Sequence, residues 1–394
     1  RNDAVTTLQE VFPQKRIEEI FIPKANNRTR GYVKGVPFTK VRYEPFNPAS
    51  RQQIADRLIE KHGWKPSEFT DTGQPKVDED VLASLPFPEC KPLVDYLELL
   101  KIIGMLAEGK NGWLKLVGPD GRIHGRVITN GAVTGRCTHN SPNLAQIPAR
   151  GQYGKQCRAL FAAPPPLVQV GADASGLELR MLAHYLAAYD GGAYAKVLLE
   201  GDIHTANQHA AGLETRDNAK TFIYAFLYGA GDEKLGSIVA PLASSAVQTK
   251  RGRALKARFF RSLPAIKRLI DDVQGVLTGP GKRPYLIGID GRHLHIRSSH
   301  SALNTLLQSA GAVLMKLATV IFHMEAQRRG LRLGEDYVQV LHVHDEAQFN
   351  TTPEKADALG RLFVESIELA GRHFGMRCPT TGEFKVGANW AETH

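Results

Sequence analysis

Five ionisable residues in three separate segments have the types that one reaction needs. Asp173 ends the apolar run LVQVGAD, Arg216 and Lys220 lie in RDNAKTFIYAFLYG, and Asp345 and Glu346 lie in HVHDE. Two carboxylates on separate strands can hold a pair of Mg²⁺ ions roughly 3.5–4 Å apart, while cations beside them bind a triphosphate. Together the three segments predict the transfer of a nucleotidyl group with two Mg²⁺ ions.

The cationic segment has a regular spacing. Arg216, Lys220, Tyr224 and Tyr228 recur every four residues on a predicted helix that Thr215 could cap. Such positions drift by only about 40° per step, so the four side chains form one stripe. Arg216 and Lys220 could hold phosphate oxygens, Tyr224 could pack on a sugar and base, and Lys220 could protonate a departing pyrophosphate. The alternative is a surface helix with exposed cations and buried tyrosines.

Short strands are expected to position the acids. Asp173 comes at the end of an apolar strand and just before an amphipathic helix, and YVQVLHVHDEAQFNT predicts two strands whose tight turn carries His344 and Asp345. Glu346 should point to the opposite face of its strand from Asp345, as an auxiliary ligand or a structural partner. Taken singly, Asp173 could equally be a helix N-cap and Asp345 a turn residue.

The remaining sequence predicts a mixed α+β fold. The opening third carries amphipathic helical patterns, and a hairpin is expected around Asp120 and Gly121. Residues 191–301 are mainly helical in pattern and could be an inserted subdomain. A long helix follows in HSALNTLLQSAGAVLMKLATVIFHMEAQRR.

Composition excludes several classes of protein. The chain has 394 residues, of which 42% are hydrophobic and 23% charged, as in ordinary globular domains. We find no uninterrupted apolar stretch of about 18 residues and no signal-peptide pattern at the start, so we expect no membrane partner. The four cysteines form no C-x-x-C pair, which argues against zinc and disulfides and favours a reducing, cytoplasmic location.

The charge distribution favours a polyanionic partner. The net charge is +10, and the stretch from Lys250 to Arg268 has eight basic residues and no acidic one. Residues 1–42 have nine basic residues against four acidic ones. Clustered cations release counterions from a phosphate backbone, so nucleic acid is the expected partner. A solvated cationic surface is the alternative for each patch.

The segments DASGLELR, R-x-x-x-K-x-x-x-Y-x-x-x-Y-G and HDE resemble the three polymerase motifs of the family A DNA polymerases, in their phage replicative branch. The likeness extends from about Gly35 to His394 and includes GAVTGRCTHNSPNLAQIP, GDIHT and GANWAETH. It implies template-directed DNA synthesis by a right-hand α+β fold, in which an antiparallel sheet forms the palm. The implied subdomains are a thumb at 1–107, a palm at 108–185 and 304–394, and helical fingers at 186–303.

The resemblance implies roles for the acidic residues and their neighbours. Asp173 and Asp345 would ligate both Mg²⁺ ions, with the backbone carbonyl of Ala174 as a further ligand. Glu346 and Lys220 would complete the catalytic set.

The resemblance also implies a nucleotide site, made of Ser175, Glu178, His204, Arg216, Lys220 and Tyr224. Glu178 would be the steric gate under the sugar that excludes a 2′-hydroxyl. Tyr224 would stack on the incoming nucleotide, and a tyrosine there implies weak discrimination against dideoxynucleotides.

Residues matching family contacts to primer-template DNA are Arg136, Tyr228, Asn304, Gln308 and His344. All base pairs present acceptors in the minor groove, so donors there can test pair shape without reading sequence. For Asn304 and Gln308 the alternative is a pair of helix-surface amides.

Two departures from the family concern partners. The chain begins too late to contain the 3′–5′ exonuclease common in the family, so we expect no proofreading in it and a possible separate exonuclease or processivity factor. Only a few tens of residues around FIPKANNRTRGYVKG stand where a phage relative has a thioredoxin-binding insertion, so dependence on thioredoxin is not expected.

The sequence leaves two alternative functions open. A single-subunit RNA polymerase would share the paired acids and the cationic stripe, although Glu178 and Tyr224 argue against it. A catalytically silent DNA-binding protein would keep the basic patches, but the presence of Asp173, Lys220 and Asp345 argues against that.

Overall fold

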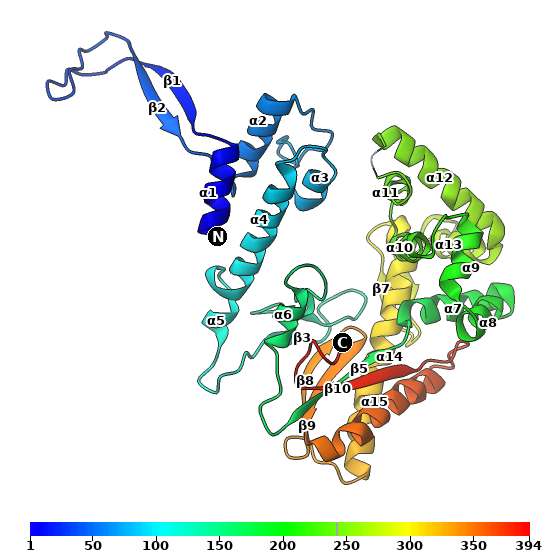
Figure 1. Ribbon diagram of the computed structural model, residues 1–394. Coiled ribbons are helices and arrows are strands. Elements are labelled where there is room, and N and C mark those ends of the chain that lie inside the picture. The colour runs from blue at the N-terminus through cyan, green and yellow to red at the C-terminus, as the bar shows by residue number, and fades with distance from the viewer. Residues whose placement is uncertain (242) are drawn as a thin grey trace. The chain divides into compact units, whose positions relative to one another are not determined.

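The computed structural model describes residues 1–241 and 243–394, and the chain divides into two units, Arg1–Ile123 and His124–His394 (Figure 1). Each unit has a hydrophobic core of its own. The boundary falls at 123–124, and the predicted subdomain limits at 107, 185 and 303 stay predictions.

Helices build most of the first unit: α1 (Asn2–Val11), α2 (Arg51–His62), α3 (Glu79–Ala83), α4 (Cys90–Ile103), the π-helical turn Gly104–Glu108 and α5 (Trp113–Leu116). Helix α2 confirms the predicted amphipathic pattern, because it buries Ile54 and Leu58 one turn apart. The Ser50 side chain caps its start, and Gly63 ends it with a φ of 63°.

A two-stranded antiparallel ribbon, which the sequence patterns did not predict, precedes α2. Strands β1 (Lys15–Phe21) and β2 (Phe38–Glu44) pair from Lys15 opposite Glu44 to Phe21 opposite Phe38. The rings of Phe21, Tyr32 and Phe38 lie within 5.7 Å of one another, centroid to centroid, and close the end of the ribbon. Most of its residues are exposed on both faces.

The prediction of a hairpin around Asp120 and Gly121 is correct for the turn but wrong for the two strands. A tight turn is present, with Gly121 at a φ of 72°, but only the single bridge Val117–Ile123 spans it. The preceding residues form helix α5, and β3 (Arg126–Ile128) pairs with β4 (Thr138–Asn140) instead. The apolar alternation on either side of the turn is too short to outweigh these other pairings.

A four-stranded antiparallel sheet lies at the centre of the second unit, in the order β10–β5–β9–β8. Its strands are β5 (Val168–Ala174), β8 (Tyr337–Val343), β9 (Glu346–Thr351) and β10 (Gly382–Gly387). One face is apolar and packs against α14 (Ala302–Arg328) and α15 (Pro353–His373) (Figure 1). Phe349 on this face lies 4.6 Å from Phe322 of α14 and 5.3 Å from Phe363 of α15, ring centroid to centroid. The opposite face carries the acidic residues.

The other helices of the second unit are α6 (Gly154–Ala159), α7 (Leu177–Asp190), α8 (Ala193–Glu200), α9 (Ile203–Ala211), α10 (Arg216–Leu227), α11 (Asp232–Ser237), α12 (Ser245–Ser262) and α13 (Pro264–Thr278), with 3-10 turns at Leu144–Gln146 and Ser299–Ser301. Residues 191–301 are therefore mainly helical, as predicted. They also contain a short hairpin of β6 (Tyr285–Ile287) and β7 (His293–His295) that was not predicted.

Helix α14 confirms the predicted long helix. The segment Ser299–Arg328 is long and apolar enough to cross a membrane by length and composition, which was not expected from the sequence. However, 56% of its apolar window is buried inside the protein, and this is typical of a core helix. Phe322 and Ala310, for example, are fully buried.

Candidate active site

Asp173 and Asp345 lie close together at the end of the central sheet. Asp173 lies near the end of β5, and Asp345 lies in the two-residue turn between β8 and β9, as predicted. The backbone N–H of Ala174 donates a hydrogen bond to the carbonyl oxygen of Asp345 over 3.0 Å. This bond joins the two chain segments directly and brings together acids that are 172 positions apart in the sequence.

Ionisation of both acids in this pair is unfavourable, because they are buried and lie close to other carboxylates. Burial, and then the proximity of Asp345 and Glu346, raise the pKa of Asp173 to about 7, and burial also raises the pKa of Asp345. A divalent cation between the two carboxylates would relieve this repulsion, so the site fits a hard cation such as Mg²⁺. Within residues 1–241 and 243–394 no cluster of three or more His, Cys, Asp or Glu ligands is found. The predicted ligand set of Asp173, Asp345 and the Ala174 carbonyl needs only two such side chains.

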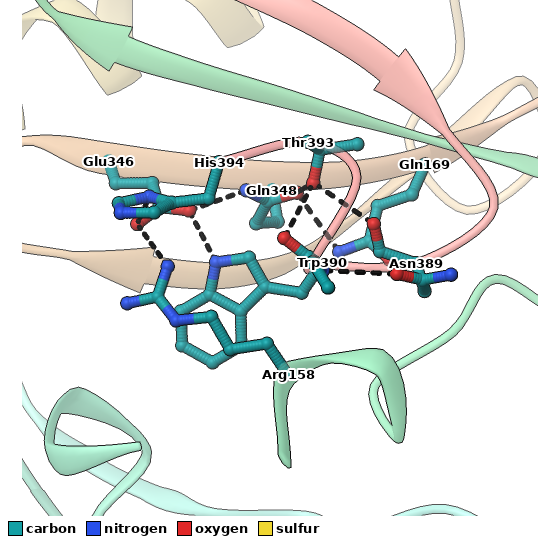
Figure 2. Close-up of polar contacts among 9 residues, drawn as sticks. Arg158, Gln169, Glu346, Gln348, Asn389, Trp390, Thr393 and His394 are labelled. Carbon is teal, nitrogen blue, oxygen red and sulfur yellow. Dashed lines mark hydrogen bonds and ion pairs between the residues drawn. The ribbon is translucent and has the colours of Figure 1, made fainter. Parts of the chain in front are cut away.

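Glu346 stands directly opposite Asp173 in the β5–β9 pairing but has different surroundings. Its carboxylate accepts hydrogen bonds from Trp390 and Gln348, and lies 3.1 Å from Nδ1 of His394 (Figure 2). Burial alone would raise the pKa of Glu346, but these contacts hold it below its usual value. The environment is that of a structural partner, and a catalytic role for Glu346 stays a prediction.

The network around Glu346 was not found from the sequence. The guanidinium of Arg158 lies 4.3 Å from the ring of Trp390 and 4.0 Å from the Glu346 carboxylate (Figure 2). Gln348 is in turn held by Gln169 and Thr393. These residues come from α6, two strands and the C-terminal segment, so no local spacing connects them.

The cationic stripe of α10 forms as predicted. The Thr215 hydroxyl accepts a hydrogen bond from the N–H of Asn218 and caps the helix. The face away from the stripe buries Phe222 and Phe226, whose rings both lie 5.3 Å from that of Phe259 on α12. This packing leaves Arg216 and Lys220 exposed.

His204 joins the stripe from the neighbouring helix α9. Its ring lies 6.2 Å from that of Tyr224, and burial together with Arg216 and Lys220 lowers its pKa. The phenol of Tyr224 has its pKa raised by burial and then by Glu178 and Asp345. The part of the stripe at Tyr224 therefore lies near the carboxylates of Glu178 and Asp345.

Arg216 already has an anionic partner within the protein. Its Nε and Nη2 donate to the carboxylate of Asp202 over 2.6 and 3.2 Å. Asp202 was not singled out from the sequence, although GDIHT was among the matching segments. An acid just before a helix start is usually only an N-cap, and the pairing with Arg216 depends on how α9 and α10 pack.

The predicted gate Glu178 lies in the first turn of α7 and contacts two predicted DNA-binding residues. The hydroxyl of Tyr228 donates to Oε1 of Glu178 over 2.5 Å, and Nη2 of Arg136 lies 3.3 Å from the same oxygen. Burial and Glu178 raise the pKa of Tyr228 to about 12. Glu178 is thus held in place from both sides.

Arg292, which was not found from the sequence, holds the loop that carries Arg136 through hydrogen bonds. Nη2 of Arg292 donates to the carbonyl of Thr134 over 2.7 Å and to the hydroxyl of Ser309 over 2.9 Å. Gly135 has a φ of 79° and lies so close to this guanidinium that a β-carbon would clash with it.

For the other predicted residues the structure shows fewer contacts. Burial, then Arg136, lowers the pKa of His344 to about 4, so this residue is uncharged at neutral pH. The carbonyl of Ser175 accepts a hydrogen bond from Arg180 over 2.7 Å. Asn304 and Gln308 lie one turn apart on α14 and are half-buried. Their contacts with substrates stay predictions.

Comparisons with known proteins agree on one family. The family model described as DNA polymerase family A matches residues 34–392. The DNA-directed DNA polymerases of Enterobacteria phage T3 and Escherichia phage T7 are 47% and 46% identical to this chain, covering 93% of it and 55% of each relative. The corresponding enzyme of Escherichia phage Phieco32 is 31% identical over 97% of this chain and 72% of its own length. The chain therefore spans about half the length of the T3 and T7 relatives.

A solved structure shares the fold. The POL domain of Pol1 from M. smegmatis, in complex with DNA primer-template and dNTP, superposes with a TM-score of 0.79 at 21% identity. The match covers 99% of this chain and 64% of that one. This likeness confirms the predicted α+β right-hand polymerase fold.

Proposed function

Because the chain belongs to DNA polymerase family A, we propose that it copies a DNA template by adding deoxynucleotides to a primer. The primer 3′-hydroxyl attacks the α-phosphate of a deoxynucleoside triphosphate, and pyrophosphate leaves. The similarity to phage enzymes further supports a role in phage DNA replication, in the cytoplasm of the host.

The observation that carries this proposal is the convergence of opposite charges on one site. Asp173 and Asp345 lie close together at the sheet end. Burial raises the pKa of Tyr224 on the cationic stripe, and the nearby carboxylates of Glu178 and Asp345 raise it further. Anionic ligands for cations and cationic ligands for phosphate are thus side by side, as nucleotidyl transfer requires.

The acidic residues would hold two Mg²⁺ ions. Asp173, Asp345 and the carbonyl of Ala174 are the proposed ligands. Bound there, the ions would help ionise the 3′-hydroxyl and neutralise charge that develops on the phosphates. Because burial and the neighbouring acids raise the pKa of Asp173, cation binding would favour the loss of a proton from it.

The cationic residues would bind and orient the triphosphate. Arg216 offers a planar fork to phosphate oxygens, and His204 and Lys220 flank it. Lys220 would give a proton to the departing pyrophosphate. Tyr224 would stack on the base and sugar, with the backbone at Ser175 near the sugar.

Glu178 would select deoxynucleotides by filling the space that a 2′-hydroxyl needs. Its contacts with Tyr228 and Arg136 restrict its carboxylate, and a restricted group excludes more effectively than a mobile one. Arg136, Asn304, Gln308 and His344 would contact the primer-template near the nascent base pair.

Extension of a labelled primer-template tests the function. We expect the chain with Mg²⁺ to extend the primer with deoxynucleotides, and Asp345→Asn to lower kcat by about 10²-fold or more, since one of the two carboxylates that hold the ions loses its charge. Asp357→Asn is the matched control, because Asp357 is an exposed acid on α15 that pairs with Arg361. Undiminished extension by Asp345→Asn would refute the assignment, and a preference for ribonucleotides would favour an RNA polymerase.

A further inference from the structure

The fork of Arg216 is occupied by a carboxylate of the same chain. Nε and Nη2 of Arg216 bind the two oxygens of Asp202, so the pair is bidentate. Carboxylate and phosphate are alternative partners for this planar fork, and both engage it through two parallel hydrogen bonds. Arg216 therefore cannot keep both contacts with Asp202 and bind a phosphate through the same nitrogens.

Asp202 is held rigidly at the start of α9. Its carboxylate accepts hydrogen bonds from the N–H of His204 over 3.0 Å and from the hydroxyl of Thr205 over 2.9 Å. These bonds, with the Arg216 guanidinium as the largest influence, hold the pKa of Asp202 far below its usual value. Asp202 is therefore a fixed negative charge beside the guanidinium of Arg216.

The pair is nevertheless easy to separate. The side chains of Arg216 and Asp202 are 51% and 43% exposed, so water can solvate both charges once they part. Exposed ion pairs contribute little net stability. A polyphosphate that carries several charges can displace the single carboxylate, whereas a weaker anion competes poorly.

We propose that Asp202 is a positioning residue. It holds Arg216 in the nucleotide-free enzyme, and the ion pair separates when Arg216 binds the incoming triphosphate. This inference rests on the proposed function. Asp202 then weakens the binding of nucleotide and of pyrophosphate by a similar factor, because both must take Arg216 from it. When pyrophosphate leaves, Arg216 returns to Asp202, and this exchange favours release of the product.

The test is Asp202→Asn, which removes the charge and keeps the cap. Asparagine caps helices about as well as aspartate, so α9 should stay folded and the melting temperature should not change. We expect the KM for deoxynucleotides and the inhibition constant of inorganic pyrophosphate to fall together, by about two- to fivefold, the strength of an exposed pair. The kcat should not rise.

Two further variants separate this role from simpler ones. Asp232→Asn is the matched control, since Asp232 also pairs with cations of a neighbouring helix, Lys256 and Arg253 of α12, but not with the stripe. Its KM should be unchanged. In an Arg216→Ala background, Asp202→Asn should no longer lower the KM, because its partner is gone.

The outcomes are distinguishable. A KM that rises or stays constant in Asp202→Asn overturns the inference, and so does a fall that persists in full without Arg216, which would mean a general charge effect. If instead the unmodified chain fails to extend any primer, the proposed function itself is refuted.

Discussion

Asp173 and Glu346 are opposite each other in the β5–β9 pairing, but their surroundings differ and so do their pKa values. Burial and neighbouring acids raise the pKa of Asp173 to about 7, while hydrogen bonds lower that of Glu346. Glu346 has its charge satisfied by Trp390, Gln348 and His394. A bound cation would therefore relieve more electrostatic repulsion at Asp173 than at Glu346.

This difference predicts a pH-dependent stability in the absence of Mg²⁺. The folded pKa of Asp173 lies above its unfolded value, so the folded state binds the proton more tightly, and stability falls as pH rises from about 4 to about 7. We expect Asp173→Asn to raise the melting temperature in chelator at pH 8, where the wild-type acid is ionised. The gain should disappear at pH 4.

Thermal unfolding across this pH range, with and without Mg²⁺, measures the effect. Adding Mg²⁺ at pH 8 should stabilise the wild type more than Asp173→Asn, because only the wild type keeps the full ligand set. Equal melting temperatures for the two proteins at pH 8 in chelator would contradict the raised pKa.

Among the secondary-structure elements, strand β5 allows the C-terminal segment to pack closely on the polar face of the sheet at Gly171. A β-carbon on Gly171 of β5 would lie 2.4 Å from both the Thr393 carbonyl oxygen and Nε2 of Gln348. The segment that carries Trp390 to Glu346 can approach this closely only because position 171 lacks a side chain.

Gly171→Ala should therefore displace this segment. We expect a loss of stability of about 1–3 kcal/mol, typical of overpacking, together with a lower rate of the proposed primer extension as Glu346 loses its partners. Urea unfolding followed by tryptophan fluorescence reports the stability, with Trp390 as one of the three tryptophans that contribute to the signal.

Gly275→Ala on α13 is the control for this substitution. A β-carbon there meets nothing within 4 Å, and alanine is a better helix former, so stability should stay equal or rise by about 0.5–1 kcal/mol. If Gly171→Ala behaved in the same way, the close contact would not constrain the segment.

For the whole molecule, we expect the arrangement of charge to matter more for DNA binding than its total. The net charge is +10, but many cations are paired with acids. The loop between β1 and β2 is different, because it has four exposed cations and no acid: Lys24, Arg28, Arg30 and Lys34. The loop is ordered by its own bonds, since Asn27 and Asn26 accept hydrogen bonds from the N–H groups of Arg30 and Lys34.

We expect these four cations to contact DNA phosphates. Replacing all four by glutamine should weaken duplex binding and lower the slope of log affinity against log salt by up to about 3.6, or about 0.9 for each contact. Fluorescence anisotropy of a labelled duplex at several salt concentrations measures this slope.

A second variant holds the net charge equal. Glutamine at Arg328, Arg329, Arg332 and Arg361 also removes four charges, but each of these cations has an acidic partner. Its salt slope should stay close to that of the wild type. Equal slopes for the two variants would mean that only total charge counts.

The sequence by itself determined the elements that carry the chemistry. The apolar run before Asp173 became β5, the four-residue spacing with its Thr215 cap became α10, and the strands around Asp345 formed as expected. Such patterns depend on neighbours within a few residues, which the sequence displays directly. The ribbon β1–β2 was missed because most of its positions are exposed and show no alternation of polar and apolar residues.

Only the tertiary structure decided which groups these residues meet. Trp390 and Glu346 are 44 positions apart, Tyr228 and Glu178 are 50 apart, and Arg216 and Asp202 come from different helices. These contacts depend on how distant segments pack, and no local period encodes that. The sequence could therefore predict the elements that carry Asp173, Asp345, Arg216 and Lys220, whereas the structure alone revealed that Asp202 holds Arg216 and that Glu346 is bound within the protein.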